Sequence, residues 1–424
     1  MNYFTYKGGV LHAEETPLDR IGSEVGTPLY VYSYASLERH FLVFDRAFRK
    51  VPHITCYSCK ANTSMALLRV VARLGGGGDI VSGGELYRAL RASIPADRIV
   101  FSGVGKSAEE IAYAVKSGIA MINVESEGEL SAIADVGQKL GKAVPVSVRV
   151  NPEIDARTHP YITTGLRKNK FGLLWPDARR LYGEMKKSRH LIAVGISSHI
   201  GSQIVEIPPF IDAVRSLKGM VRELAGAGIG LRYIDIGGGL GITYKDEAPP
   251  HPEEYAKAIE AELEGMGLTL VLEPGRVIVG NAGIFVTKLL YVKATPDKTF
   301  YVVDGAMNDL VRPAFYGAYH AIMPVAQTKA KMRKVDVVGP VCESGDFFAK
   351  GRKLAELAPG ALIAVMGAGA YGFSMSSNYN SRPRVAEVLV RGKEFFVIRK
   401  RERYSDLIAG ESIPGFLEGQ HEFS

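Results

Sequence analysis

Residues 233–241 read YIDIGGGLG, a short apolar run that ends in three consecutive glycines. A run of branched and aromatic residues of this length predicts a buried strand. Glycines directly after a strand predict a tight turn or a backbone that approaches a ligand closely. Seven more runs predict strands, at residues 53–58, 78–81, 98–101, 121–124, 145–150, 193–198 and 269–273.

Helical patterns fill the gaps between these runs. Three Ser-x-x-Glu capping boxes, at residues 82–85, 107–110 and 126–129, predict helix starts. Later helices are predicted at residues 176–187, 209–227 and 252–266. Eight alternations of strand and helix with short connections favour a closed parallel (β/α)8 barrel of the TIM type over an open sheet. The periodicity alone leaves the open sheet as an alternative.

After about residue 280 the pattern changes from alternating to all-β. Six strands are predicted, at residues 283–293, 298–303, 334–341, 361–366, 384–390 and 394–400. Near the N-terminus, two short strands flank the turn at residues 7–9. We therefore expect an α/β protein with three parts: residues 1–30 join the β domain, residues 31–280 form the barrel, and residues 281–424 form a C-terminal β domain.

The composition limits the class of protein. The 424 residues are 46% apolar and 23% charged, which excludes a disordered chain. The net charge of +7 is not gathered in basic runs, so nucleic-acid binding is not predicted, and the excess suits an anionic small molecule. No apolar run reaches the roughly 18 residues that a membrane span needs, and the start lacks the pattern of a secretory signal. We expect a cytoplasmic enzyme.

The three cysteines exclude a disulfide framework. Cys56 and Cys59 form a C-x-x-C pattern, but positions three apart on a strand face opposite sides, so a shared disulfide or metal is not expected. We interpret both as packing residues. No cysteine and histidine cluster has the spacing of a zinc site, and no metal is predicted.

Polar residues follow the predicted strands at one end of the barrel, where catalytic groups collect. Lys60 follows the first strand, His199 and Ser202 follow the sixth, and the segment from Glu273 to Arg276 follows the eighth. The glycine-rich backbone after the seventh strand and the arginine after the eighth predict a phosphate site. A lysine across the mouth and a carboxylate beside that site suggest pyridoxal phosphate, whose aldehyde needs a lysine and whose ring nitrogen needs a charged partner.

Seven segments, taken in order, resemble one enzyme family over nearly the whole chain. They are residues 57–62 (YSCKAN), 198–203 (SHIGSQ), 235–241 (DIGGGLG), 273–276 (EPGR), 304–313 (DGAMNDLVRP), 342–346 (CESGD) and 369–372 (GAYG). The sequence closely resembles the fold-type III pyridoxal-phosphate decarboxylases and, within them, the diaminopimelate decarboxylases. The resemblance implies the barrel and β-domain architecture that alanine racemase shares. It also implies the decarboxylation of meso-2,6-diaminopimelate to L-lysine and CO₂, the last step of lysine biosynthesis.

The resemblance assigns a cofactor set. Lys60 matches the Schiff-base lysine, so we expect the site to lower its ordinary pKa of ~10.4 by desolvation or by nearby positive charge. Glu273 matches the carboxylate that keeps the pyridine nitrogen protonated; the racemases have an arginine there, so Glu273 favours decarboxylation. The other matching residues are His199 on the ring face, Ser202, Gly238, Gly239, Gly275 and Arg276 on the phosphate, and Tyr371 between cofactor and substrate.

The resemblance also assigns a substrate set and an assembly. Arg276, Arg312 and Tyr316 match the binders of the distal carboxylate of the substrate, Glu343 matches the acceptor of its ammonium group, and Tyr371 also contacts it. Cys342 matches the acid that reprotonates the product carbon. In the family, the Cys-Glu segment reaches the site of the neighbouring subunit, which implies a homodimer with shared active sites.

Two alternatives to this function remain from the sequence. One is another fold-type III amino-acid decarboxylase, of ornithine, arginine or lysine type. The other is a non-catalytic pyridoxal-phosphate carrier, although small carriers with this barrel lack the β domain. The long polar stretch at residues 155–170 predicts a functional loop, of the kind that often forms a lid.

Overall fold

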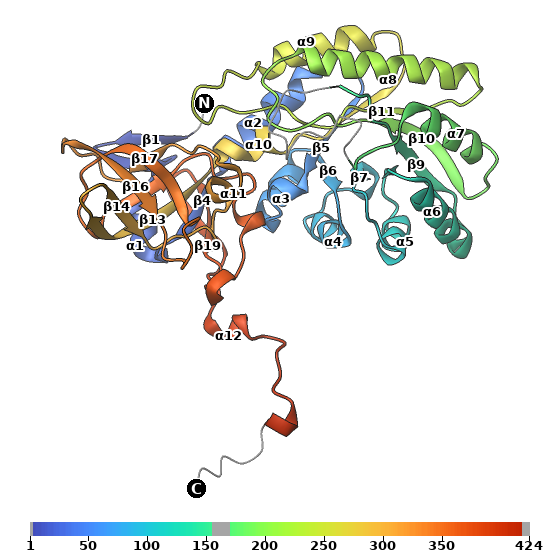
Figure 1. Ribbon diagram of the computed structural model, residues 1–424. Helices are drawn as coiled ribbons and strands as arrows, with labels where there is room; N and C mark the ends of the chain where they lie inside the picture. The colour runs from blue at the N-terminus through green and yellow to red at the C-terminus, as the bar shows by residue number, and fades with distance from the viewer. Residues whose placement is uncertain (1–2, 155–169, 418–424) are drawn as a thin grey trace.

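The structure is a computed structural model that describes residues 3–154 and 170–417. Eight parallel strands close into a barrel (Figure 1). The pairing of the first barrel strand with the last, in register from Leu270 opposite His53, shows the closure. The predicted barrel is therefore confirmed and the open sheet is wrong. The barrel strands are β5 (His53–Ser58), β6 (Gly77–Ile80), β7 (Ile99–Phe101), β8 (Met121–Val124), β9 (Val144–Arg149), β10 (Leu191–Ser197), β11 (Tyr233–Asp235) and β12 (Thr269–Leu272).

Helices surround the barrel and cover its outer face (Figure 1). Ser82, Ser107 and Ser126 each cap a helix by accepting the backbone N–H three residues ahead. Of these three pairs, only Ser107 and Glu110 form the reciprocal capping box. Glu85 and Glu129 instead accept the backbone N–H of the residue before the capping serine. The helices are α2 (Tyr34–Ala47), α3 (Met65–Arg73), α4 (Gly83–Arg91), α5 (Ala108–Ser117), α6 (Glu127–Leu140), α7 (Trp175–Met185), α8 (Pro208–Gly226) and α9 (Pro252–Leu263).

The second part of the molecule is built on a nine-stranded sheet. An N-terminal strand, β4 (Leu29–Ser33), lies inside this sheet between two strands from the C-terminal half, β13 (Gly283–Ala294) and β19 (Ala386–Arg391). The chain therefore enters the sheet before it forms the barrel. The other strands are β13 (Gly283–Ala294), β14 (Thr299–Val303), β15 (Ile322–Pro324), β16 (Met332–Val338), β17 (Phe347–Ala355), β18 (Leu362–Val365), β19 (Ala386–Arg391) and β20 (Glu394–Arg399).

Short elements complete the chain. The N-terminal hairpin, β1 (Phe4–Lys7) and β2 (Val10–Ala13), pairs with β3 (Thr16–Pro17) in a separate three-stranded sheet. The helices α1 (Leu18–Val25), α10 (Arg276–Val279), α11 (Arg312–Tyr316) and α12 (Tyr404–Leu407) each span one or two turns. Beyond α12 the chain runs away from the body of the molecule (Figure 1). Among the described residues, none of the helices has the length and apolar character to cross a membrane.

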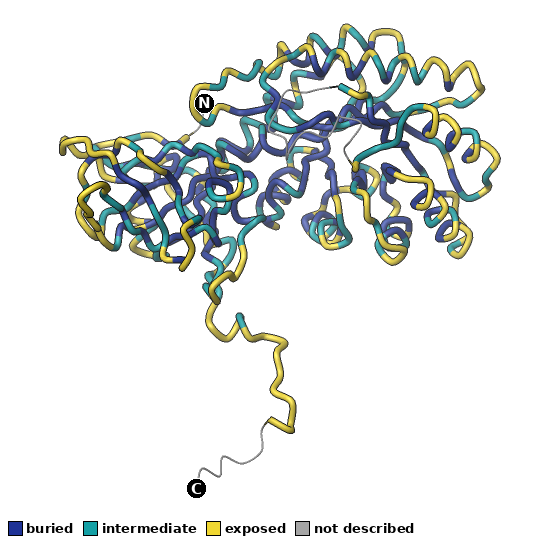
Figure 2. Tube along the Cα trace, viewed as in Figure 1, coloured by how far each residue is buried: buried dark blue, intermediate teal, exposed yellow. Residues whose placement is uncertain are grey.

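Hydrogen bonds join the barrel mouth to the nine-stranded sheet. The Asn62 side chain, two residues after Lys60, donates to the Tyr32 hydroxyl on β4 and to the Gly369 carbonyl, both at 3.1 Å. The Tyr371 N–H donates to the Ala61 carbonyl at 2.8 Å. The buried core passes without a break from one part to the other (Figure 2). The loop that carries Lys60 is therefore held against the segment that carries Tyr371.

Candidate active site

A cavity of about 580 Å³ opens at the carboxyl ends of the barrel strands, beside the β domain. It brings together most of the residues that the sequence singles out, although they come from segments more than 300 residues apart. Its lining includes Lys60, His199, Ser202, Gly239, Glu273, Gly275, Arg276, Arg312, Tyr316 and Tyr371.

Lys60 lies in η1 (Cys59–Ala61), the 3₁₀ turn after β5. Its Nζ is 3.0 Å from Oδ2 of Asp79, a buried residue on β6 whose same oxygen also accepts a bond from the Ser58 hydroxyl. Desolvation opposes the charge on Lys60, but the carboxylates of Asp79 and Glu273 outweigh it and raise the lysine pKa. The expectation of a lowered pKa is therefore wrong for this structure, because acids and not cations surround the amine.

Glu273 follows β12 and belongs to a buried polar network. Ser102 donates to Glu273 Oε1 at 3.4 Å, and Asn123 donates to both Ser102 and Asp235 at 3.0 Å. Burial, and then the nearby carboxylates of Asp235 and Asp79, raise the pKa of Glu273. A cation beside this cluster would relieve the repulsion among its three acids. The network is therefore suited to hold a protonated ring nitrogen.

The glycines let the loops at the ends of the barrel strands pack closely against one another. A Cβ on Gly238 would lie 2.1 Å from the Glu273 carbonyl oxygen, and one on Gly275 would lie 2.9 Å from Ser58 Cβ. Gly239 has a φ of +109°, which side chains rarely adopt. Only glycine fits these positions. Gly239 and Gly275 line the cavity, and backbone N–H groups at such a rim can bind an anion.

His199 follows β10 and lies partly buried beside this rim. Its Nδ1 accepts the Gly238 N–H at 3.2 Å, which leaves the proton of the neutral ring on Nε2. Desolvation, then the positive charge of Arg149, lower the pKa of His199 well below its ordinary value. The ring is therefore neutral, and a neutral aromatic ring can stack on a flat cofactor.

Two buried arginines face the cavity. Arg276 donates to the Tyr244 hydroxyl at 2.7 Å and to the Ser202 hydroxyl at 3.1 Å, and its Nε is buried without a partner among the described residues. Arg312, from the β domain, places its Cζ 4.6 Å from the centre of the same Tyr244 ring. In the described part of the chain, neither guanidinium is paired with a carboxylate. Two buried cations without an acid form a site for anions.

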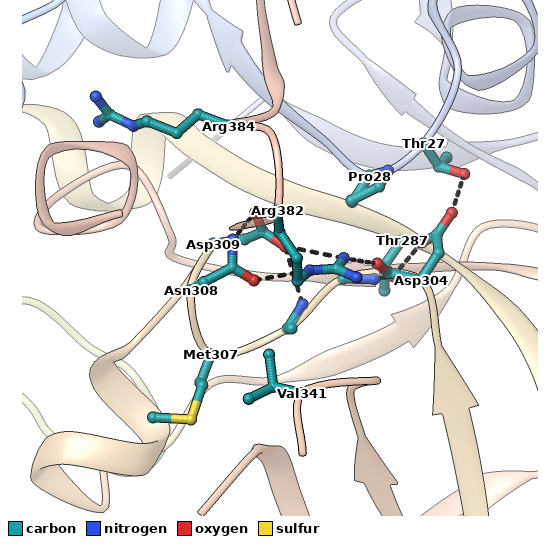
Figure 3. Close-up of polar contacts among 12 residues, drawn as sticks. Thr27, Pro28, Thr287, Asp304, Met307, Asn308, Asp309, Val341, Arg382 and Arg384 are labelled. Atoms are coloured by element: carbon teal, nitrogen blue, oxygen red, sulfur yellow. Dashed lines mark hydrogen bonds and ion pairs between the residues drawn. The ribbon is translucent and has the colours of Figure 1, made fainter. Parts of the chain in front are cut away.

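The segment before Arg312 is fixed by side chains of the β domain (Figure 3). Arg382 donates to the Asn308 side chain at 3.0 Å and to the Asp304 carbonyl at 2.6 Å. The Asp304 carboxylate accepts bonds from the hydroxyls of Thr27 at 2.6 Å and Thr287 at 2.7 Å. These contacts hold the segment that leads into α11, and so into Arg312.

Cys342 and Glu343 lie apart from the other predicted residues. Cys342 is exposed, and its N–H donates to the Asn380 side chain at 3.2 Å. Glu343 accepts a bond from the Tyr379 hydroxyl at 3.0 Å. Neither residue lines the cavity of its own chain. The structure of one chain therefore does not bring these two residues to Lys60.

Sequence reasoning missed several residues of the site. Asp79 and Asp235 lie at the ends of barrel strands, and this position alone could have identified them as site residues. Tyr244 and His320 lie in loops without a local pattern, and only the folded chain places them beside the arginines. Of the predicted functional loop at residues 155–170, residues 155–169 lie outside the described residues.

Comparisons with known proteins agree with this geometry. The family model described as pyridoxal-dependent decarboxylase, pyridoxal binding domain, matches residues 34–280. A diaminopimelate decarboxylase of Pseudomonas aeruginosa is 49% identical over 413 residues, which cover 97% of this chain and 99% of that protein. The chain belongs to the diaminopimelate decarboxylase family. The resemblance found in the sequence is confirmed.

Solved structures of diaminopimelate decarboxylases share the fold. The Helicobacter pylori enzyme, in complex with L-lysine, is 44% identical with a TM-score of 0.90, covering 92% of this chain and 98% of that one. The enzyme of M. jannaschii is 37% identical with a TM-score of 0.94, covering 98% and 99%. Both similarities span the barrel and the β domain together.

Proposed function

We propose that this member of the diaminopimelate decarboxylase family converts meso-2,6-diaminopimelate to L-lysine and CO₂ with pyridoxal phosphate bound in the barrel mouth. The observation that carries the proposal is the pair of buried arginines, Arg276 and Arg312, in the cavity that also holds Lys60. A phosphorylated cofactor and a substrate with a second carboxylate together need two such cations. The reaction is the last step of lysine biosynthesis, and we place it in the cytoplasm.

The residues present fit pyridoxal phosphate. The glycines at the rim and the Arg276 guanidinium, which lines the cavity without a carboxylate partner among the described residues, suit a phosphate, and the acids around Glu273 suit a protonated ring nitrogen. When bound, the cofactor supplies an electron sink for the pair left by the departing CO₂. We assign the aldehyde link to Lys60, the ring face to His199, the ring nitrogen to Glu273, and the phosphate to Ser202, Gly238, Gly239, Gly275 and Arg276. Tyr371 contacts cofactor and substrate.

Substrate choice follows from charge. Arg312, with Arg276 and Tyr316, binds the distal carboxylate in this proposal, and Glu343 accepts the distal ammonium group. A decarboxylase of lysine or ornithine has no distal carboxylate to bind, so a buried Arg312 would leave an uncompensated charge there. The buried Arg312 therefore favours a substrate with two amino-acid ends.

The position of Cys342 supports a shared site. It lies exposed and outside its own cavity, whereas the proton donor to the product carbon must reach the reacting atoms. We propose a symmetric homodimer in which Cys342 and Glu343 complete the cavity of the partner. Each dimer then has two sites, and each site uses both chains.

The proposal is tested by measuring CO₂ release from meso-diaminopimelate, L-lysine, L-ornithine and L-arginine in parallel, with the protein loaded with pyridoxal phosphate. We expect release from meso-diaminopimelate only. Equal or faster release from one of the other three would support a different decarboxylase of this fold. No release from any of the four, with the cofactor bound, would support a carrier.

A further inference from the structure

His320 lies behind Arg312, outside the cavity lining. It follows α11 in the chain and is completely buried. Its Nε2 is 3.0 Å from Nη1 of Arg312, and its Nδ1 is 2.8 Å from the carbonyl oxygen of Met366, directly after β18. The histidine therefore bridges the guanidinium and the backbone of the nine-stranded sheet.

These two partners fix the protonation of the ring. The Met366 carbonyl can only accept, so Nδ1 carries the proton, and the guanidinium can only donate, so Nε2 is the acceptor. Burial, and then the positive charge of Arg312, lower the pKa of His320 to about 3. The ring therefore remains neutral, and able to accept from Arg312, at every pH at which the enzyme would work.

Neighbouring groups hold the histidine itself in place. Arg352 on β17 donates to the His320 carbonyl oxygen at 2.8 Å. The Tyr244 ring packs edge-on against the imidazole, with the centroids 5.4 Å apart. Since Tyr244 also contacts Arg276 and Arg312, the two guanidinium groups are arranged around one tyrosine and one histidine.

We propose that His320 is a positioning residue that orients Arg312 toward the distal carboxylate and so sets the preference for substrates that carry one. The inference rests on the proposed function, because it assumes that Arg312 binds this carboxylate. His320 uses one guanidinium nitrogen and leaves the other donors to face the cavity. Because the His320 ring is neutral, it can hold Arg312 without neutralising the positive charge that would bind the substrate carboxylate.

The chain offers a matched pair of variants that separates the two bonds of His320. In His320→Gln, the side-chain oxygen can reach the position of Nε2 and accept from Arg312, but the bond to Met366 is lost. In His320→Asn, the side-chain amide can donate to Met366, but it is too short to reach Arg312. If His320 had a purely structural role, the two variants would bind L-lysine equally well, or His320→Asn would bind it better.

The probes are L-lysine, which retains the carboxylate that Arg312 is proposed to hold, and cadaverine, which lacks it. Their inhibition constants against the cofactor-loaded enzyme should separate the variants. We expect His320→Asn to raise the inhibition constant of L-lysine about tenfold, as expected for the loss of one bond to a charged group. The constant for His320→Gln should stay within about threefold of that of the parent. The inhibition constant of cadaverine should be the same for both variants and the parent.

Arg312→Ala, measured in the same series, separates the two levels of the inference. If Arg312→Ala weakens the binding of L-lysine and both His320 variants leave this binding unchanged, the positioning role is refuted and the proposed function stands. If Arg312→Ala leaves L-lysine and meso-diaminopimelate unchanged, the substrate assignment itself fails. A loss of affinity in His320→Asn that extends equally to cadaverine would show a structural role instead.

Discussion

At the scale of single residues, the described part of the site is defined by buried acids and buried arginines that do not pair with one another. Three buried acids, Asp79, Asp235 and Glu273, have Lys60 as their nearby cation, which pairs with Asp79, and two buried arginines, Arg276 and Arg312, line the same cavity as Lys60 and Glu273. Uncompensated buried charges are costly in an empty protein and favourable when a ligand of opposite charge binds. A zwitterionic cofactor with a cationic ring and an anionic phosphate matches this separation.

Glu273→Gln should lower kcat for meso-diaminopimelate at least about tenfold, which corresponds to 1.36 kcal/mol of lost transition-state stabilisation. The amide cannot hold the ring nitrogen protonated, so the electron sink is weaker. Cofactor affinity, measured by fluorescence titration, should change little, because the phosphate contacts remain. The melting temperature should not fall, since one of the crowded acids is removed. An unchanged kcat would exclude Glu273 from the chemistry.

Arg312→Ala should act on the substrate and not on the cofactor. Truncation leaves the distal carboxylate without its partner, which costs about 2–5 kcal/mol in kcat/KM for a charged pair. Steady-state kinetics with meso-diaminopimelate measures this loss, and a pyridoxal-phosphate titration of the same sample is the control. Normal handling of meso-diaminopimelate by the variant would contradict the assignment of the substrate.

At the scale of elements, the sequence predicted best what depends on local pattern. The eight barrel strands and the polar residues that follow them, such as Lys60 and His199, were recognisable because apolar runs and polar segments alternate along the chain. Strand β17 was missed because its sequence, FFAKGRKLA, interrupts the apolar pattern with a glycine and three basic residues. His320 was not recognisable as part of the site, because its contacts with Arg312 and Met366 depend on strands that meet only in the folded protein.

The segment before α11 should show a measurable pH effect through Asp309. Burial raises the pKa of this carboxyl to about 7, so the folded protein keeps a proton that the unfolded chain releases near pH 4. Between these values the unfolded state binds fewer protons, and stability falls as the pH rises. Asp309→Asn removes this dependence.

We therefore expect Asp309→Asn to gain stability relative to the parent between pH 5 and pH 8. Melting temperatures of both proteins across this range measure the difference. A constant difference, or one of opposite sign, would show that Asp309 is ionised in the folded protein.

At the scale of the whole molecule, the barrel carries the residues proposed to bind the cofactor, and the β domain carries Arg312 and Tyr371. Strand β4 and the bonds of Asn62 hold these two parts together. Cys342 is exposed and does not line the cavity of its own chain. The sequence suggested a use for it only through the family resemblance, because no local pattern shows which subunit a loop will serve.

Complementation tests the shared site. Lys60→Ala and Cys342→Ala should each be inactive or strongly impaired as homodimers. Mixed under conditions that allow exchange, they form heterodimers in which one site has both defects and the other has neither, so activity should return. Subunit exchange is verified with differently tagged chains. Exchange without recovery of activity would place both residues in one site of one chain.

The proposed function can be tested by following L-lysine and CO₂ together after meso-diaminopimelate is added to the enzyme loaded with pyridoxal phosphate. We expect both products to form in a one-to-one ratio, Lys60→Ala to form neither, and borohydride to fix the cofactor on the peptide containing Lys60, as the proposed function requires. Cofactor-loaded enzyme that releases no CO₂ from meso-diaminopimelate, or a cofactor fixed on another lysine, would contradict it.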